Sequence, residues 1–336
     1  MLLLAIGSGI AFAEQGEADD TDPTLSEAPV AEPGPEVVAD RTATSQTFRL
    51  PEGALETRIF ENPINYRDGE GEWQPIGEEL KETGATLSNG ANDFDLTLPE
   101  QADEGPVRLS TSEGWLASEL VGIGTEAVSL EGNSASYEAT HPGLTFDFSS
   151  LPNGLKENIE LADASQPHTL TYNLSASDGL TPSLTEDGGI EFQNAKEETV
   201  VSLPAPVMFD SAPGEPALSH AIHYGLQPRE GGGWTLTLEA DSAWLESPDR
   251  VWPAVIDPTV TVPTSELDCA IWGKKAEAGF GGCGSGGQKE LPLKYSPNLE
   301  SVKDEWSRAL LRFDLSAIPN DVYIGSTTLN MRAPEA

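Results

Sequence analysis

Basic side chains are scarce in this chain of 336 residues: Lys and Arg number 18, against 56 Asp and Glu, for a formal net charge of -38. So acidic a chain repels phosphate backbones and anionic lipid headgroups, and we therefore expect no nucleic acid and no membrane surface as a partner. Solubility outside the cell or adaptation to salt accounts for the charge. A divalent-cation site is the alternative. The acidic stretch EQGEADDTDP lacks the glycine turn and terminal Glu of a calcium loop, so we predict no metal site.

Cysteine is equally scarce, with Cys269 and Cys283 alone. Both lie in a glycine-rich stretch that has little core of its own. A disulfide between them would close a loop of about 15 residues and stabilise it by roughly 3 kcal/mol. Two free thiols or half of a metal site are the alternatives, but no C-x-x-C occurs and none of the four histidines is near in sequence. An oxidising compartment favours the disulfide.

Long apolar runs are confined to the start of the chain. Residues 1–13, MLLLAIGSGIAFA, end in a small-x-small triplet and are followed by acidic sequence, which is typical of a secretory signal without its positively charged front. The run is too short to span a bilayer, and no later stretch approaches 18 apolar residues. We therefore predict export by the secretory pathway, an extracellular or cell wall-associated location, and no membrane span.

The segment 14–44 lacks aromatic residues and combines dense acid with four prolines. Such a segment cannot bury enough apolar surface to offset the entropy lost on ordering. We predict a disordered acidic linker.

Motifs for catalysis and cofactor binding are also missing: there is no G-x-S-x-G, H-E-x-x-H, P-loop or Rossmann fingerprint. His220 and His223 are three apart on an expected strand, where odd spacing sends side chains to opposite faces. His141 precedes a Pro-Gly turn. The sequence does not exclude a Ser-His-Asp triad built from residues far apart along the chain. We predict no catalytic residue and no cofactor.

What the sequence does contain is strand patterning. In HTLTYNLSA apolar residues alternate with Thr, Asn and Ser, and GWTLTLEA shows the same period of two. No window of a dozen residues carries a helical apolar stripe. Glycine and proline, 33 and 26 in number, separate the runs. The pattern predicts an all-β fold of antiparallel strands packed as a sandwich, with a β-rich leader over residues 45–262. Further strands are expected at 57–61, 93–98, 107–120, 144–148, 155–161, 190–194 and 251–260.

One expected strand, GLKENIEL, breaks its own pattern. Its inner face would hold Leu155, Glu157, Ile159 and Leu161, which places a carboxylate among apolar side chains. A buried charge needs a partner, so we expect Glu157 at a rim or paired with a base. A catalytic role for Glu157 is the alternative.

Several stretches together resemble a known family. TRIFENPINYRDGEGEWQPIGEEL, GLKENIEL, SLPAPVMFDSAP, AWLESPDRVWPAVIDPTV and SRALLRFDLSAIP are similar, in this order, to the N-terminal region of large secreted actinobacterial proteins. There a β-rich leader precedes a DNRLRE domain, often followed by RHS (YD) repeats or LamG-type modules. The resemblance implies that residues 263–336 are the N-terminal part of a DNRLRE domain, which is similar to a carbohydrate-binding jelly roll.

This second domain is expected to be truncated, because a jelly roll needs about eight strands. The closing stretch 308–332 is patterned as a two-stranded hairpin, which is marginal alone. Its cover is expected in downstream domains of the same polypeptide. The sequence also differs from the usual first stretch of the DNRLRE domain, because the segment with the two cysteines occupies that place.

These observations favour a non-catalytic structural or adhesive module at the front of a secreted protein. The alternative is binding of a cell-wall or extracellular glycan by aromatic side chains in the second domain, namely Trp272, Tyr295 and Trp306. Core burial is the competing interpretation of these three residues. A third hypothesis is a polysaccharide-degrading enzyme with Asp147 or Glu157 as acid and base.

Overall fold

The computed structural model describes residues 34–51, 53–60, 62–213 and 216–262, the backbone of 269–274 and 305–310, and residue 318. The predicted signal segment, residues 14–33 of the acidic segment, Cys283 and Tyr295 lie outside the described residues. So does most of the hairpin expected at 308–332.

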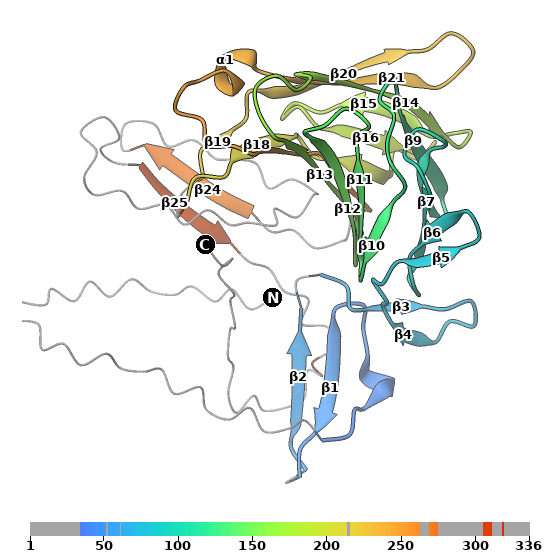
Figure 1. The fold of residues 1–336 in the computed structure, drawn as a ribbon. Coiled ribbons are helices and arrows are strands. Elements are labelled where there is room, and N and C mark those ends of the chain that lie inside the picture. Colours follow the sequence, from blue (N-terminus) through green and yellow to red (C-terminus); the bar gives the residue numbers. More distant parts are fainter. Residues whose placement is uncertain are drawn as a thin grey trace, which may run out of the picture.

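Two large antiparallel sheets dominate the described chain and share one apolar core (Figure 1). This confirms the predicted all-β, sandwich-like fold. The smaller sheet has eight strands in the order β20 (Ile222–Pro228), β21 (Trp234–Ala240), β14 (Thr169–Ala176), β9 (Gly114–Leu120), β8 (Val107–Thr111), β7 (Phe94–Pro99), β6 (Thr86–Ser88) and β5 (Lys81–Thr83).

The larger sheet has eleven strands. Eight follow one path, in the order β10 (Ser129–Glu131), β11 (Ser134–Glu138), β12 (Leu144–Leu151), β13 (Gly154–Leu161), β23 (Thr259–Thr261), β17 (Thr199–Leu203), β16 (Ile190–Gln193) and β15 (Thr181–Leu184). Three more extend it from β13: β22 (Ala254–Asp257), β18 (Val207–Asp210) and β19 (Leu218–Ser219).

Period-two alternation determines which side chains enter the core. In β12 every second residue from Leu144 is buried, and Phe146 and Phe148 point inward between half-buried neighbours. In β14, Leu170, Tyr172 and Leu174 are buried in the same way. Because successive side chains of a strand lie on opposite faces, the sequence pattern of HTLTYNLSA was sufficient to predict this face.

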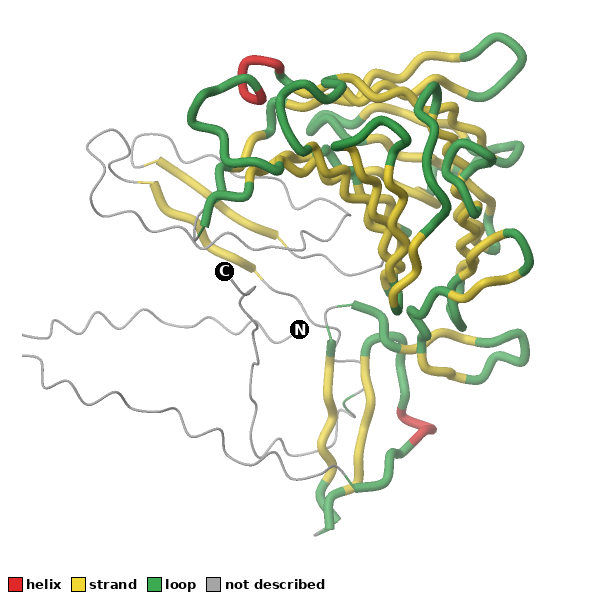
Figure 2. Tube along the Cα trace, in the orientation of Figure 1, coloured by secondary structure: helices red, strands yellow, loops and turns green. Residues whose placement is uncertain are grey.

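Short ribbons and turns complete the described chain (Figure 2). Near its start lie the 3₁₀ turn η1 (Val38–Asp40) and the paired strands β1 (Ser45–Arg49) with β2 (Leu55–Ile59) and β3 (Asn65–Arg67) with β4 (Trp73–Pro75). The α-helix of the described chain, α1, is one turn over Ser242–Leu245. None of the helices in the described ranges has the length and apolar character needed to cross a membrane.

The end of the predicted acidic linker has defined contacts. Arg41 pairs with Glu36 at 2.5 Å and donates from Nη1 to the carbonyl of Trp73 at 3.0 Å. The side chain of Asn65 donates to the carbonyl of Thr42 at 2.8 Å. Residues 34–44 therefore differ from the predicted disorder, because Arg41 brings a positive charge and several donors into an otherwise acidic stretch.

Further along the chain, β24 (Cys269–Lys274) pairs with β25 (Glu305–Leu310) in antiparallel register, with Trp272 opposite Ser307 and Trp306 opposite Gly273. The first strand of the expected hairpin, RALLRF, thus begins within β25. The pairing partner of β25 is β24, which follows the leader region 45–262 along the chain.

Candidate functional site

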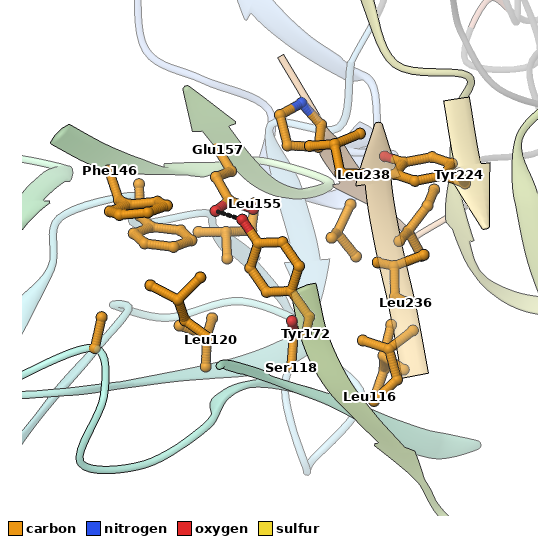
Figure 3. Close-up of a pocket in the computed structure, with 17 residues that line it drawn as sticks. Leu116, Ser118, Leu120, Phe146, Leu155, Glu157, Tyr172, Tyr224, Leu236 and Leu238 are labelled. Atoms are coloured by element: carbon orange, nitrogen blue, oxygen red, sulfur yellow. Dashed lines mark hydrogen bonds between the residues drawn. The ribbon is translucent and has the colours of Figure 1, made fainter. Parts of the chain in front are cut away.

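A small cavity lies between the two sheets (Figure 3). Its volume is about 50 Å³. Both sheets contribute apolar walls, including Leu116, Phe146, Leu155, Leu236 and Leu238. Three side chains with titratable groups share this lining: Glu157, Tyr172 and Tyr224. A polar cluster in an apolar cavity is the arrangement in which unusual proton chemistry is expected.

The side chain of Glu157 points into the cavity because successive side chains of β13 (Gly154–Leu161) lie on opposite faces of the sheet. Leu155 and Ile159, two positions to either side, are buried, and Phe148 is its cross-strand partner on β12. Glu157 itself keeps some accessible surface, which we attribute to the cavity that its carboxyl lines. The sequence predicted this inner face correctly.

The partner of Glu157 is neither a base nor bulk solvent. Tyr172, from β14 of the opposite sheet, donates its hydroxyl to Oε1 of Glu157 at 3.0 Å, as the dashed line in Figure 3 marks. The neighbouring base, Lys156, pairs with Asp257 at 2.9 Å instead. The expectation of a rim position or a basic partner for Glu157 is therefore wrong, because a tyrosine hydroxyl supplies the hydrogen bond.

Burial dominates the electrostatics of this cluster. It raises the pKa of Glu157 from the ordinary 4.5 to about 8, against the opposing effect of the Tyr172 hydrogen bond and with a further contribution from the charge of Asp257. Burial also raises the pKa of the Tyr172 hydroxyl, and the nearby Glu157 raises it further. At neutral pH the carboxyl of Glu157 is mostly protonated.

Tyr224, on β20, is only 7% exposed, and its hydroxyl has no hydrogen-bond partner among the described residues. A buried hydroxyl without a hydrogen-bond partner is costly, and the cavity that Tyr224 lines has room for water that would supply one.

The cavity limits what Glu157 can do chemically. A volume of about 50 Å³ has room for a few water molecules. Ligand pockets for drug-sized molecules are typically about 300–1,000 Å³. Glu157 can exchange a proton with water in the cavity, but a sugar ring or a nucleotide does not fit.

Asp147 cannot act together with Glu157. The register pairs Asp147 with Asn158 and Phe148 with Glu157, and cross-strand partners share a face. Asp147 therefore lies on the outer face and Glu157 on the inner face of the same sheet. The pair of carboxylates that a polysaccharide-degrading enzyme needs is not formed by these two residues.

The other sequence-predicted site residues are dispersed or untested. His141, His220 and His223 are exposed, and no group of three metal-ligating side chains occurs among the residues the structure describes. Trp272 and Trp306 are defined only by the backbone pairing of their strands. The proposed disulfide partner Cys283 and the proposed glycan contact Tyr295 lie outside the described residues, so both assignments stay predictions.

One polar contact could not be predicted from the sequence, because its two residues, His168 and Ser242, are 74 positions apart. The Nδ1 atom of His168 lies 2.8 Å from Oγ of Ser242, and its Nε2 atom lies 3.2 Å from the carbonyl oxygen of Ala164. A carbonyl only accepts, so Nε2 carries the proton and Nδ1 accepts from Ser242. The pair ties α1 to the loop before β14.

Comparison with known proteins adds a class of activity that the fold does not indicate. The chain is 26% identical over 277 residues to the tRNA nuclease WapA of Bacillus subtilis strain 168; the alignment covers 74% of this chain and 12% of the relative. It is 26% identical over 285 residues to the tRNA(Glu)-specific nuclease WapA of Bacillus subtilis subsp. natto strain BEST195, with the same coverages. Against the tRNA3(Ser)-specific nuclease WapA of Bacillus spizizenii, identity is 24% over 257 residues, or 68% of this chain and 10% of the relative.

The chain thus spans about 12% of the length of the two Bacillus subtilis relatives. No protein-family profile matches the chain. No solved structure matches it either.

These relatives contradict several predictions made from the sequence. All three are named as nucleases that act on tRNA. They contradict the prediction that the protein is no enzyme. They also contradict the structural or adhesive role, with its glycan-binding and polysaccharide-degrading alternatives, and the exclusion of nucleic acid as a partner. The exclusion was wrong because net charge was summed over a chain that corresponds to about 12% of its relatives, whereas RNA binding depends on local basic surfaces.

Proposed function

We propose that this chain is part of a nuclease that cleaves tRNA. The observation that carries the proposal is the alignment over 74% of the chain with a relative named as a tRNA nuclease. Two further relatives with the same kind of name align over 74% and 68% of the chain. They are named for different tRNAs, so the shared region supports the reaction class and not a particular tRNA.

The geometry limits which residues can take part in cleavage. General acid-base catalysis requires a group within hydrogen-bond reach of the reacting phosphodiester. Glu157 can carry a proton at neutral pH, but its cavity of about 50 Å³ does not admit a nucleotide. We therefore assign Glu157 no part in the cleavage of tRNA.

The charge of the chain adds a second constraint. With a net charge of -38, this chain repels the phosphates of tRNA. In the proposed nuclease, tRNA is held by basic side chains whose local field outweighs that repulsion. Cleavage should therefore weaken as salt screens those contacts.

The test compares two proteins on the same substrate: the full gene product that contains this sequence, and the 336-residue chain alone. Each is incubated with purified tRNA, and the fragments are separated on a denaturing gel. We expect the full product to cut tRNA, and its Glu157→Gln variant to cut equally well. Intact tRNA after incubation with the folded full product would refute the proposal. Cutting by the chain alone would support it and would place the cleaving residues within this sequence.

We also propose that the protein is exported. The apolar run of residues 1–13 and its small-x-small end support this location. Fractionation of producing cells tests it: the protein should be found outside the cytoplasm, and retention of the whole pool in the cytoplasm would contradict the proposal.

A further inference from the structure

The contact between Glu157 and Tyr172 joins the two sheets directly. Glu157 belongs to β13 of the eleven-stranded sheet, and Tyr172 belongs to β14 of the eight-stranded sheet. The side chains around this contact are mostly apolar (Figure 3). The Tyr172 hydrogen bond by itself favours the ionised carboxylate, but the loss of hydration that a charge suffers among apolar walls outweighs it, so the neutral carboxyl is the stable form in this place.

Among the residues that the structure describes, the groups that face Glu157 provide no positive charge for it. Tyr172 and Tyr224 face it from the opposite sheet. Asp257, at the end of β22, adds a negative charge from the same sheet. The base next to Glu157 along the chain, Lys156, is already paired with Asp257 at 2.9 Å. An ionised Glu157 would therefore be surrounded by apolar walls, two hydroxyls and a like charge.

We propose that Glu157 is a proton-dependent latch between the two sheets, closed while its carboxyl is neutral and released when the carboxyl loses its proton. On release, the carboxylate gains water and the sheets separate at the cavity. The proton goes to solvent, so no other reactant is needed. The latch is independent of the proposed tRNA cleavage.

The direction of the pH effect follows from the two protonation equilibria. The pKa of Glu157 is about 8 in the closed state and near the ordinary 4.5 once the carboxyl reaches water. Between these values the closed state holds a proton that the open state does not, so opening becomes more favourable as pH rises. The opening constant should increase by up to about tenfold per pH unit, or about a thousandfold in all, and level off above about pH 8.

The test is urea unfolding of the whole chain between about pH 5 and about pH 9, for the wild type and for Glu157→Gln. Glutamine keeps an oxygen that can accept the Tyr172 hydroxyl, but it does not ionise. Other titrating groups affect both proteins alike. The wild-type unfolding constant should rise relative to that of the variant by about a thousandfold across this range. Equal pH dependence in the two proteins would overturn the proposal.

A second measurement keeps the proposal testable if Glu157→Gln does not fold. Infrared spectroscopy of the folded wild type in heavy water should show a carbonyl band of a protonated carboxyl at neutral pH that disappears in mild alkali. The variant Asp257→Asn removes the like charge and should shift that disappearance to lower pH. Absence of the band at neutral pH, or an unchanged midpoint in Asp257→Asn, would also overturn it.

Discussion

Two buried tyrosines between the sheets differ in a single hydrogen bond. Tyr137 of β11 donates its hydroxyl to the carbonyl of Pro99, on β7 of the opposite sheet, at 2.7 Å. Tyr224 is also buried, but its hydroxyl has no partner among the described residues. Burial raises the pKa of both hydroxyls above the ordinary value of 10, so neither is ionised at neutral pH. The two residues form a matched pair for measuring one inter-sheet hydrogen bond.

We expect Tyr137→Phe to lower the free energy of unfolding by about 1–2 kcal/mol, because it leaves the Pro99 carbonyl without its donor. Tyr224→Phe should be neutral or stabilising, since it removes a buried hydroxyl that lacks a partner. Urea unfolding at neutral pH measures both variants. Equal losses in the two would show that the Tyr137 bond contributes nothing specific.

A buried ion pair fixes the end of β18. Asp210 accepts from Nη1 of Arg250 at 2.7 Å and from the backbone amides of Ala217 and Val251 at 2.7 and 3.2 Å. The guanidinium also lies 3.6 Å from the ring centroid of Trp244. Burial alone would raise the pKa of Asp210, but the amides and Arg250 together lower it. The stability from this carboxylate is present above the unfolded pKa and is lost as pH falls through the lower folded pKa.

Arg250→Met should therefore cost about 3–5 kcal/mol of unfolding free energy at neutral pH, because it leaves a buried carboxylate without its cation. Arg58→Met is the control. The Arg58–Glu56 pair is about one-third exposed on each side, and such pairs contribute roughly 0–1 kcal/mol. A loss in Arg250→Met no greater than that in Arg58→Met would contradict the account of this site.

At the scale of elements, the start of β13 requires a residue without a side chain. A Cβ on Gly154 would lie 2.2 Å from the carbonyl oxygen of Val260 on the neighbouring strand β23. Backbone cannot move aside as a flexible side chain can. This close approach holds β23 against β13 near the cavity.

Gly154→Ala should lower the unfolding free energy by about 1–3 kcal/mol, as overpacked cores do. Gly69→Ala is the control, since a Cβ there would meet nothing within 4 Å. Thermal unfolding measures both. An unchanged midpoint for Gly154→Ala would mean that β23 can shift freely.

Strands were the most predictable elements. The alternation of residues 169–176 and 234–240 gave both the strands and their buried faces, because a period of two leaves a strand one inner side. The sequence did not indicate which strands pair. β14 lies between β9 and β21, although β10 to β13 intervene along the chain in the other sheet. Such pairing depends on contacts far apart in sequence, as does the partner of Glu157.

At the scale of the whole molecule, the net charge of -38 opposes compaction. We expect added sodium chloride to raise the free energy of unfolding. Most of the gain should fall between about 0.01 and about 0.15 M, where the Debye length shortens from about 30 to about 8 Å. Urea unfolding in a salt series measures this. Sucrose at matched osmolality is the control, and stability that does not depend on salt would contradict the expectation.

The sequence was least informative about function. Its charge and its lack of catalytic motifs pointed away from enzymes and from nucleic acid, because both criteria consider only the residues of this chain. The relatives it matches are roughly six times as long, since an alignment over 74% of this chain covers 12% of the relative. Activity in so long a protein can depend on residues that this chain does not contain.

The formation of new tRNA ends tests the proposed nuclease activity most directly. Purified tRNA is incubated with the full gene product, and the ends of the tRNA are mapped by sequencing before and after. We expect cuts at defined positions in one or a few tRNAs, at an equal rate in the Glu157→Gln variant. Unchanged ends in every tRNA, with protein shown to be folded, would contradict it.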